Sequence, residues 1–171
     1  MKFNSRLSAA VTALRDIVSA QGERESSQPA VFIQQIQGWF EQFILPLYPE
    51  SPKQFLAVRF LLETPVAEIP ATPASCSRFK QFVEKFSYRD RSNFIRSIAN
   101  LINDLIIHRH PDWLDPLQGD YEYYYCPTTD EVVLEGECGG TLTLSGQPWD
   151  GGKSLVPAKR SILVKAGVLL E

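Results

Sequence analysis

The sequence predicts an α+β protein in which about five helices are followed by a small antiparallel β-meander. Up to about residue 108, the apolar residues recur at the three-to-four-residue spacing of amphipathic helices. From Asp120 to Asp150 the chain is instead rich in tyrosine, valine and threonine, interrupted by proline and glycine turn signals. We therefore expect a helical part over residues 1–116 and a β part over residues 117–171, packed together as one domain.

Three helices are expected before residue 64. The first ends near Gly22, and the second begins at Pro29 and continues to about Leu45, where Pro46 stops it. The third begins at the capping pattern Ser51-Pro52-Lys53-Gln54 and continues to about Glu63. The apolar faces of the first two contain Phe3, Leu7, Ala10, Val11, Leu14, Ile17 and Val18, and Phe32, Ile36, Trp39, Phe40 and Phe43.

Two more helices are expected after an extended connector. Residues 64–74 contain three prolines and predict that connector. A fourth helix over about 77–86 and a fifth over about 90–108 follow, and Pro111 lies beyond the end of the fifth. This pair is basic, because it carries Arg78, Lys80, Lys85, Arg89, Arg91, Arg96 and Arg109 against Glu84, Asp90 and Asp104.

The tyrosine-rich stretch predicts a hairpin with a four-residue turn at Pro127-Thr128-Thr129-Asp130. Such a turn pairs Tyr125 with Val132 and Tyr123 with Leu134. Alternation then puts Tyr121, Tyr123, Tyr125, Val132 and Leu134 on one face, and Glu122, Tyr124, Cys126, Glu131, Val133 and Glu135 on the other. The first is the expected core face, because the second holds the charges.

A three-residue turn at Cys138-Gly139-Gly140 is expected next, because a two-residue turn would place Leu142 and Leu144 on the charged face. The three-residue turn sets Leu144 opposite Leu134. Residues 146–154 look like a phosphate-binding loop but lack its first glycine, so we expect a β-turn anchored by Trp149. A last strand over Ser161–Val164 is expected to complete the meander.

Charge is distributed unevenly along the chain. Residues 110–152 contain nine acidic residues and no Lys or Arg; because the whole chain has a net charge of −3, the remainder carries +6. The acidic residues are Asp112, Asp115, Asp120, Glu122, Asp130, Glu131, Glu135, Glu137 and Asp150. An acidic face of this kind attracts a basic partner, or meets the basic helices of the same chain.

The composition argues against several functional classes. The N-terminus lacks a continuous apolar run and no stretch of ~18 apolar residues occurs, so we expect no signal peptide, no membrane span and a cytoplasmic location. The mild overall acidity of the chain argues against nucleic-acid binding. Three irregularly spaced cysteines predict free thiols. The sequence contains no cofactor-binding motif, and we expect no cofactor.

Four residues are candidates for an enzymatic site, namely His108, His110, Cys126 and Cys138. Two His and two Cys are ligands that tetrahedral zinc accepts, but their spacing is unlike that of zinc fingers, and His residues two apart diverge on a helix. Cys126 is also a candidate nucleophile with a histidine base, although the neighbouring Glu131 would raise the pKa of its thiol. We expect no metal site, and a metal- or thiol-dependent enzyme is the alternative interpretation.

The run YYYCPTTDEVVLEG, a glycine turn and strand, and Pro157-Ala158-Lys159-Arg160 leading into ILVKAGVLL resemble the C-terminal part of some small bacterial toxin-immunity proteins. The resemblance covers roughly the last fifty residues. It implies a cytoplasmic, non-catalytic protein that binds a cognate toxin and blocks its active site, often through acidic residues. It assigns no individual functional residue.

The sequence therefore predicts a non-enzymatic protein-binding module that binds a basic partner through an acidic, tyrosine-rich sheet face. The expected binding residues are Glu122, Tyr124, Asp130, Glu131, Glu135 and Glu137, and no catalytic residue is expected. A further alternative is a structural subunit that forms a homo-oligomer through apolar helix faces, including Trp39, Phe40 and the phenylalanines of the fourth helix.

Overall fold

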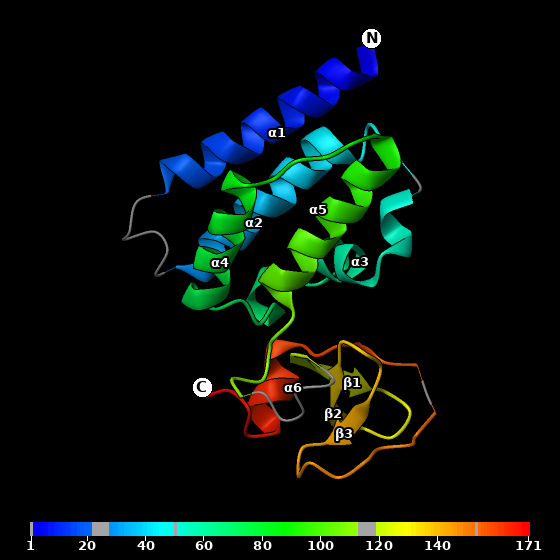
Figure 1. Cartoon of the computed structure of the whole chain (residues 1–171). Helices are drawn as coiled ribbons and strands as arrows, with labels where there is room; N and C mark the ends of the chain where they lie inside the picture. Colours follow the sequence, from blue (N-terminus) through cyan, green and yellow to red (C-terminus); the bar gives the residue numbers. More distant parts are fainter. Residues whose placement is uncertain (1, 22–27, 50, 113–118, 153) are drawn as a thin grey trace. The chain divides into compact units, whose positions relative to one another are not determined.

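The computed structural model describes residues 2–21, 28–49, 51–112, 119–152 and 154–171 (Figure 1). The predicted α+β class is confirmed: helices come first and a four-stranded antiparallel sheet follows. The chain divides into two compact units, Met1–Ile106, here called the helical unit, and Ile107–Glu171, the sheet unit. The packing of the two as one domain stays a prediction. Gly22 and Asp115 lie outside the described residues.

Among its described residues, the helical unit contains five α-helices, as expected for this part of the chain. They are α1 (Lys2–Ala20), α2 (Pro29–Trp39), α3 (Leu56–Glu63), α4 (Pro73–Glu84) and α5 (Arg91–Ile106). The predicted apolar faces are buried at Leu7, Leu14, Phe32 and Ile36, and α5 packs against α3 and α4. The side chain of Phe3, expected on the first face, lies outside those that the structure describes.

The second helix changes its winding before it ends. After Trp39 it continues as a π-helix, η2 (Phe40–Ile44), in which the Leu45 N–H donates to the Phe40 carbonyl at 3.0 Å. The Trp39 indole N–H donates to the Ala10 carbonyl at 2.8 Å, which ties this helix to α1. Trp39 and Phe40 are buried in the core of the helical unit. They therefore do not supply the oligomer surface predicted for them.

The start of the third helix, the end of the fifth helix and the extended connector differ from the prediction. The third helix begins at Leu56, because Phe55 is extended (φ −80°, ψ 120°) and separates it from a 3₁₀ turn, η3 (Ser51–Gln54). The expected extended connector contains a second 3₁₀ turn, η4 (Val66–Glu68). The fifth helix ends at Ile106, two residues before His108, and residues 108–110 continue as extended chain paired with β1.

The fourth helix begins earlier than expected, at Pro73, because Thr72 caps it. The Ser75 N–H donates to Thr72 Oγ1 at 3.1 Å, and the Thr72 N–H donates to Ser75 Oγ at 2.9 Å. This reciprocal pair is a capping box with serine in the place of the usual glutamate, and Pro73 occupies the first helical position, where a missing N–H costs nothing.

The sheet unit contains β1 (Tyr121–Cys126), β2 (Glu131–Gly136), β3 (Thr141–Thr143) and β4 (Val156–Pro157), in the order β3-β2-β1-β4. The predicted first hairpin is confirmed in its turn and register, with Tyr125 opposite Val132 and Tyr123 opposite Leu134. Asp130 ends the turn at φ 54°, a left-handed conformation that Asp tolerates better than most residues. The predicted face forms the core of the unit, which contains Tyr121, Tyr123, Leu134, Ala158 and Leu163.

The second turn differs from the prediction by one position. Gly136 donates to the Gly140 carbonyl at 2.8 Å, so the three turn residues are 137–139, with Gly139 left-handed at φ 88°. Leu142 therefore pairs with Leu134, and the predicted pairing of Leu144 with Leu134 is wrong. The pairing moves by two residues, which leaves Leu142 on the core face because side chains alternate with a period of two.

The predicted last strand at Ser161–Val164 is also wrong, because this segment belongs to a short helix, α6 (Arg160–Lys165). The helix ends in a Schellman motif, in which the Val168 N–H donates to the Leu163 carbonyl and Gly167 is left-handed at φ 75°. The fourth strand is instead β4, which joins the other edge of the sheet by pairing with Tyr124 and Tyr125 of β1.

Candidate functional site

The acidic residues predicted to bind a partner all lie on the β1–β2 hairpin and its flanks, but in separate groups. The first group lies near the open end of the hairpin, where Glu122 pairs directly with Glu135. Arg109 places its guanidinium 3.0 Å from Asp120 and 3.6 Å from Glu122. Tyr124 donates its hydroxyl to Glu122 Oε2 at 3.1 Å. An arginine of the sheet unit itself thus neutralises part of the predicted acidic face.

The pKa values of this first group show that it is withdrawn from solvent. Burial raises the pKa of Glu135, and burial together with the charge of Glu122 raises the pKa of the Tyr124 hydroxyl. A partner would have to break the contacts of Glu122 and desolvate groups that are already half-buried. The first group is therefore a weak candidate for recognition.

The second group, Asp130 and Glu131, lies at the turn between β1 and β2 and is exposed. Asp130 accepts a hydrogen bond from the Tyr125 hydroxyl at 2.9 Å and lies 3.7 Å from the ammonium of Lys165. Glu131 accepts a hydrogen bond from the Trp149 indole N–H at 3.2 Å. Hydrogen bonds from Thr129 and then Trp149 lower the pKa of Glu131, so this carboxylate stays charged.

Glu137 is exposed in the turn at the other end of β2. It lies six positions after Glu131, which corresponds to about 20 Å along an extended strand. The six predicted binding residues therefore do not make one patch. They divide into a half-buried group around Arg109, the exposed pair Asp130 and Glu131, and the exposed Glu137, whose side chain lies beside Gly119.

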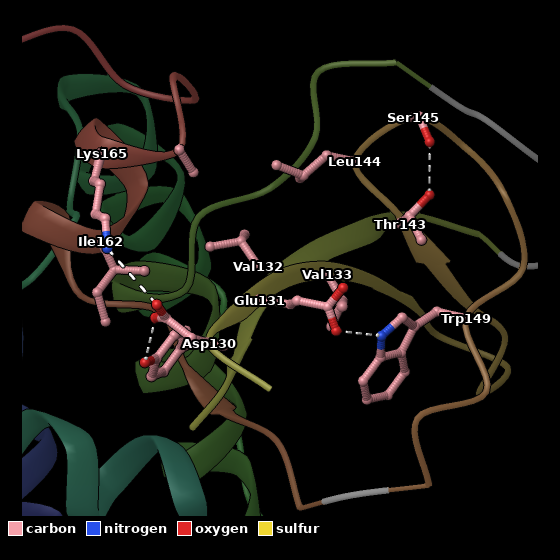
Figure 2. A pocket seen from close by; sticks show the side chains of 12 residues that line it. Asp130, Glu131, Val132, Val133, Thr143, Leu144, Ser145, Trp149, Ile162 and Lys165 are labelled. Atoms are coloured by element: carbon pink, nitrogen blue, oxygen red, sulfur yellow. Dashed lines mark hydrogen bonds and ion pairs between the residues drawn. The ribbon is translucent and has the colours of Figure 1, made fainter. Parts of the chain in front are cut away.

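A groove of about 450 Å³ lies beside the exposed pair. Its lining residues come from β1 and β2, from the turn after β3, from the loop at Trp149 and from α6: Tyr125, Asp130, Glu131, Val132, Val133, Thr143, Leu144, Ser145, Trp149, Ile162, Lys165 and Ala166. Figure 2 shows Trp149 directed toward Glu131, and Lys165 directed toward Asp130 from the side of α6. The groove thus combines apolar walls with an acidic rim.

Leu144 and the α6 residues Ile162 and Lys165 are groove residues that sequence reasoning missed. Leu144 was expected opposite Leu134, whereas it lies in a turn and is 44% exposed. Ile162 and Lys165 lie in and beside the segment expected to be a strand. The Gly167 that ends α6 was the sequence signal for a helix here. Trp149 is expected from the sequence only as the anchor of a turn. In the structure its indole N–H donates to Glu131, and Trp149 lines the groove.

The two histidines lie on the same side of their segment, contrary to the expectation that they diverge. Because residues 108–110 are extended, side chains two apart point the same way. The ring of His108 stacks on Tyr123 at a centroid distance of 5.4 Å, and that of His110 lies 5.9 Å from the same ring. Burial lowers the pKa of His108, and the charge of Arg160 lowers it further.

Cys126 and Cys138 do not approach one another. Cys126 is buried at one end of the β1–β2 hairpin, whereas Cys138 is exposed in the turn at the opposite end. Hydrogen bonds from Thr129 lower the pKa of the Cys126 thiol. The expectation that Glu131 raises this pKa is therefore wrong in its net direction, because the charge of Glu131 has a smaller effect than these hydrogen bonds. Over residues 2–21, 28–49, 51–112, 119–152 and 154–171, no three His, Cys, Asp or Glu side chains are grouped as a metal site.

Comparison with protein-family models, curated proteins and solved structures gives no match for this chain. In the part that the structure describes, no helix has both the length and the apolar character needed to cross a bilayer.

Proposed function

We propose that this chain is a non-enzymatic protein-binding module, of the toxin-immunity kind, that captures a basic protein partner in the cytoplasm. The observation that carries the proposal is the groove of the sheet unit, in which the exposed carboxylates Asp130 and Glu131 stand beside Trp149 and the exposed Leu144. Acidic groups at the rim speed encounter with a basic partner, and apolar walls supply the affinity.

The groove supports binding better than the rest of the acidic face does. Asp130 and Lys165 are 70% and 80% exposed, so their ion pair contributes little and is easily exchanged for a partner's cation. Glu122, in contrast, is 16% exposed and already paired with Arg109. We therefore assign recognition to Asp130 and Glu131, and give Glu122, Tyr124 and Glu135 a structural role within the sheet.

The first test is an affinity pull-down from a lysate of the source cell, at low and at high salt, with mass spectrometry of the retained proteins. We expect a basic protein that is retained at low salt and released at high salt, because exposed charges are screened beyond about 8 Å at physiological ionic strength. Equal retention at both salt concentrations would contradict recognition through the acidic rim.

The second test uses substitutions that remove charge and keep shape. The double variant Asp130→Asn and Glu131→Gln preserves oxygen acceptors for Tyr125 and Trp149. We expect it to weaken binding of the retained protein about tenfold at low salt, chiefly through the association rate. Glu137→Gln is the matched control at the far end of β2, and equal loss in both variants would refute the assignment.

A further inference from the structure

The indole ring of Trp149 is held in the groove by two contacts. Its N–H donates to Glu131 Oε2 at 3.2 Å, and Figure 2 shows the ring turned toward that carboxylate. The backbone of Gly151 lies against the ring, because a Cβ at Gly151 would collide with Cζ2 of the indole and lie only 2.6 Å from its ring neighbours, Cε2 and Cη2. A position so close to three adjacent ring atoms lies over the face of the ring. A ligand that stacks on Trp149 must therefore use the opposite face.

The carboxylate of Glu131 is oriented by its neighbours, and its charge is not balanced by them. Trp149 and the side chain of Thr129 both donate hydrogen bonds to it. Both donors are neutral, and among the described ion pairs none involves Glu131. A carboxylate has about four lone-pair sites on its two oxygens, so two hydrogen bonds leave acceptor capacity for a cation. Glu131 is thus fixed in place and ready to accept further N–H donors.

The charges in the groove leave room for one further cation. Two carboxylates and one ammonium, those of Asp130, Glu131 and Lys165, occur among the lining residues, so the lining has a net charge of −1. The ammonium of Lys165 comes from α6 and lies 3.7 Å from Asp130. Asp130 is therefore already paired within the chain. The position for an added positive charge is beside Glu131 and Trp149, on the other side of the groove.

We infer that the groove receives one arginine side chain of the partner protein, which stacks on the free face of Trp149 and donates hydrogen bonds to Glu131. This inference rests on the proposed function and specifies the group that anchors the partner. A guanidinium is planar and weakly hydrated, so it stacks on an indole while its N–H groups donate within its own plane. The ammonium of a lysine is a compact, strongly hydrated charge and satisfies both contacts less well.

The size and the apolar walls of the groove agree with one anchoring side chain. Its volume of about 450 Å³ lies toward the lower end of the range of roughly 300–1,000 Å³ that is usual for small-ligand pockets. Val132 and Leu144 supply apolar surface for the three-carbon stem of an arginine, and Leu144 is 44% exposed in the free chain. Arginine side chains that are desolvated against an aromatic ring contribute much of the affinity at protein interfaces.

The test is a titration of the full chain with N-acetyl-arginine methylamide, followed by NMR. A fragment of this size should bind with a dissociation constant of about 1 mM. The indole N–H signal of Trp149, assigned by its loss in Trp149→Phe, should shift. That of Trp39 should not, because its indole N–H donates to the Ala10 carbonyl in the core of the helical unit. The citrulline analogue, which has the same shape and no charge, should bind about tenfold more weakly, and the lysine analogue about threefold more weakly.

Substitutions in the chain test the two contacts separately. Glu131→Gln keeps an oxygen acceptor for Trp149 and removes the charge, so it should weaken binding of the arginine compound about tenfold. Glu137→Gln makes the same change at the other end of β2 and should leave binding unchanged. Gly151→Ala introduces a methyl group where the indole ring lies, and Gly151 has no left-handed φ, so the ring must move and the backbone need not. Binding should fall about tenfold, with the β1 amide signals of the folded chain retained.

The outcomes separate this inference from the proposed function. If the Trp149 signal does not shift at about twenty times the expected dissociation constant, or if the citrulline compound binds equally well, the arginine site is refuted. Equal losses in Glu131→Gln and Glu137→Gln would refute it too, because the compound would then respond to overall charge alone. The pull-down decides the proposed function independently. If the arginine compound binds and no basic protein is retained, a free guanidinium compound is the ligand, and capture of a partner's side chain is overturned.

Discussion

His108 connects the start of the sheet unit to β1 through both its backbone and its side chain. Its carbonyl accepts the N–H of Tyr123 at 2.9 Å, and its ring stacks on the same residue. Burial and then Arg160 lower the pKa of the imidazole from its usual 6.5. The folded chain therefore resists the proton that the unfolded chain accepts, and this difference makes stability depend on pH.

We predict that His108→Phe makes the sheet unit less sensitive to acid. At about pH 8 the imidazole is neutral in both states and contributes no pH dependence. As the pH falls below 6.5, the unfolded chain binds a proton first, so the free energy of unfolding decreases. Phenylalanine keeps a ring against Tyr123 and removes this effect.

Urea denaturation at about pH 8 and pH 5.5, followed through the amide signals of β1, measures the difference. The midpoint of the parent chain should fall more between the two pH values than that of the variant. Equal shifts in the two proteins would show that His108 does not contribute.

At the scale of single elements, local capping decides where the helices start and stop. Thr72 sets the start of α4 and Gly167 sets the end of α6, and both act through backbone hydrogen bonds within a few residues. Apolar periodicity found the middle of α4 but missed its first turn, because Pro73 and Ala74 continue a proline-rich connector in the sequence.

We predict that Thr72→Ala destabilises the helical unit by about 1 kcal/mol, within the usual range for loss of an N-cap. The substitution removes the acceptor for the Ser75 N–H and leaves the backbone unchanged. Ser77→Ala, at an exposed position of the same helix, is the control and should change stability by less than about 0.5 kcal/mol. Equal urea midpoints for parent and Thr72→Ala would contradict the capping role.

At the scale of the whole molecule, two units with separate cores each bury one cysteine. Cys76 lies fully buried in the helical unit, and Cys126 lies fully buried in the sheet unit. Burial raises the pKa of the Cys76 thiol to about 11, whereas Cys138 is exposed. The three thiols therefore report on different parts of the chain under native conditions.

We predict that a thiol reagent at about pH 8 modifies Cys138 first and the other two only when their unit opens. In the closed helical unit, burial raises the pKa of Cys76 to about 11, so the little thiolate present there does not bypass the need for opening. A time course by peptide mass spectrometry measures the three rates. If Cys76 were modified as fast as Cys138, Cys76 would not be buried in the core of the helical unit.

The sequence by itself determined the α+β class, the first hairpin and its two faces. These features depend on short-range physics: a period of two along each strand, a period of 3.6 along each helix, and a four-residue turn whose residues suit it. The pairing of Tyr123 with Leu134 followed from the turn alone. The acidic residues were also found by counting, although counting could not separate Asp130 and Glu131 from Glu122.

The tertiary structure decided what depends on contacts between distant residues. Residues 160–165 form a helix because Leu163 packs into the core around Tyr121 and Tyr123, a contact that outweighs the β propensity of Ile162 and Val164. The same packing places α6 so that Lys165 reaches Asp130. The groove exists only because α6, the turn at Leu144 and Trp149 meet around Val132, and no local pattern predicts such a meeting.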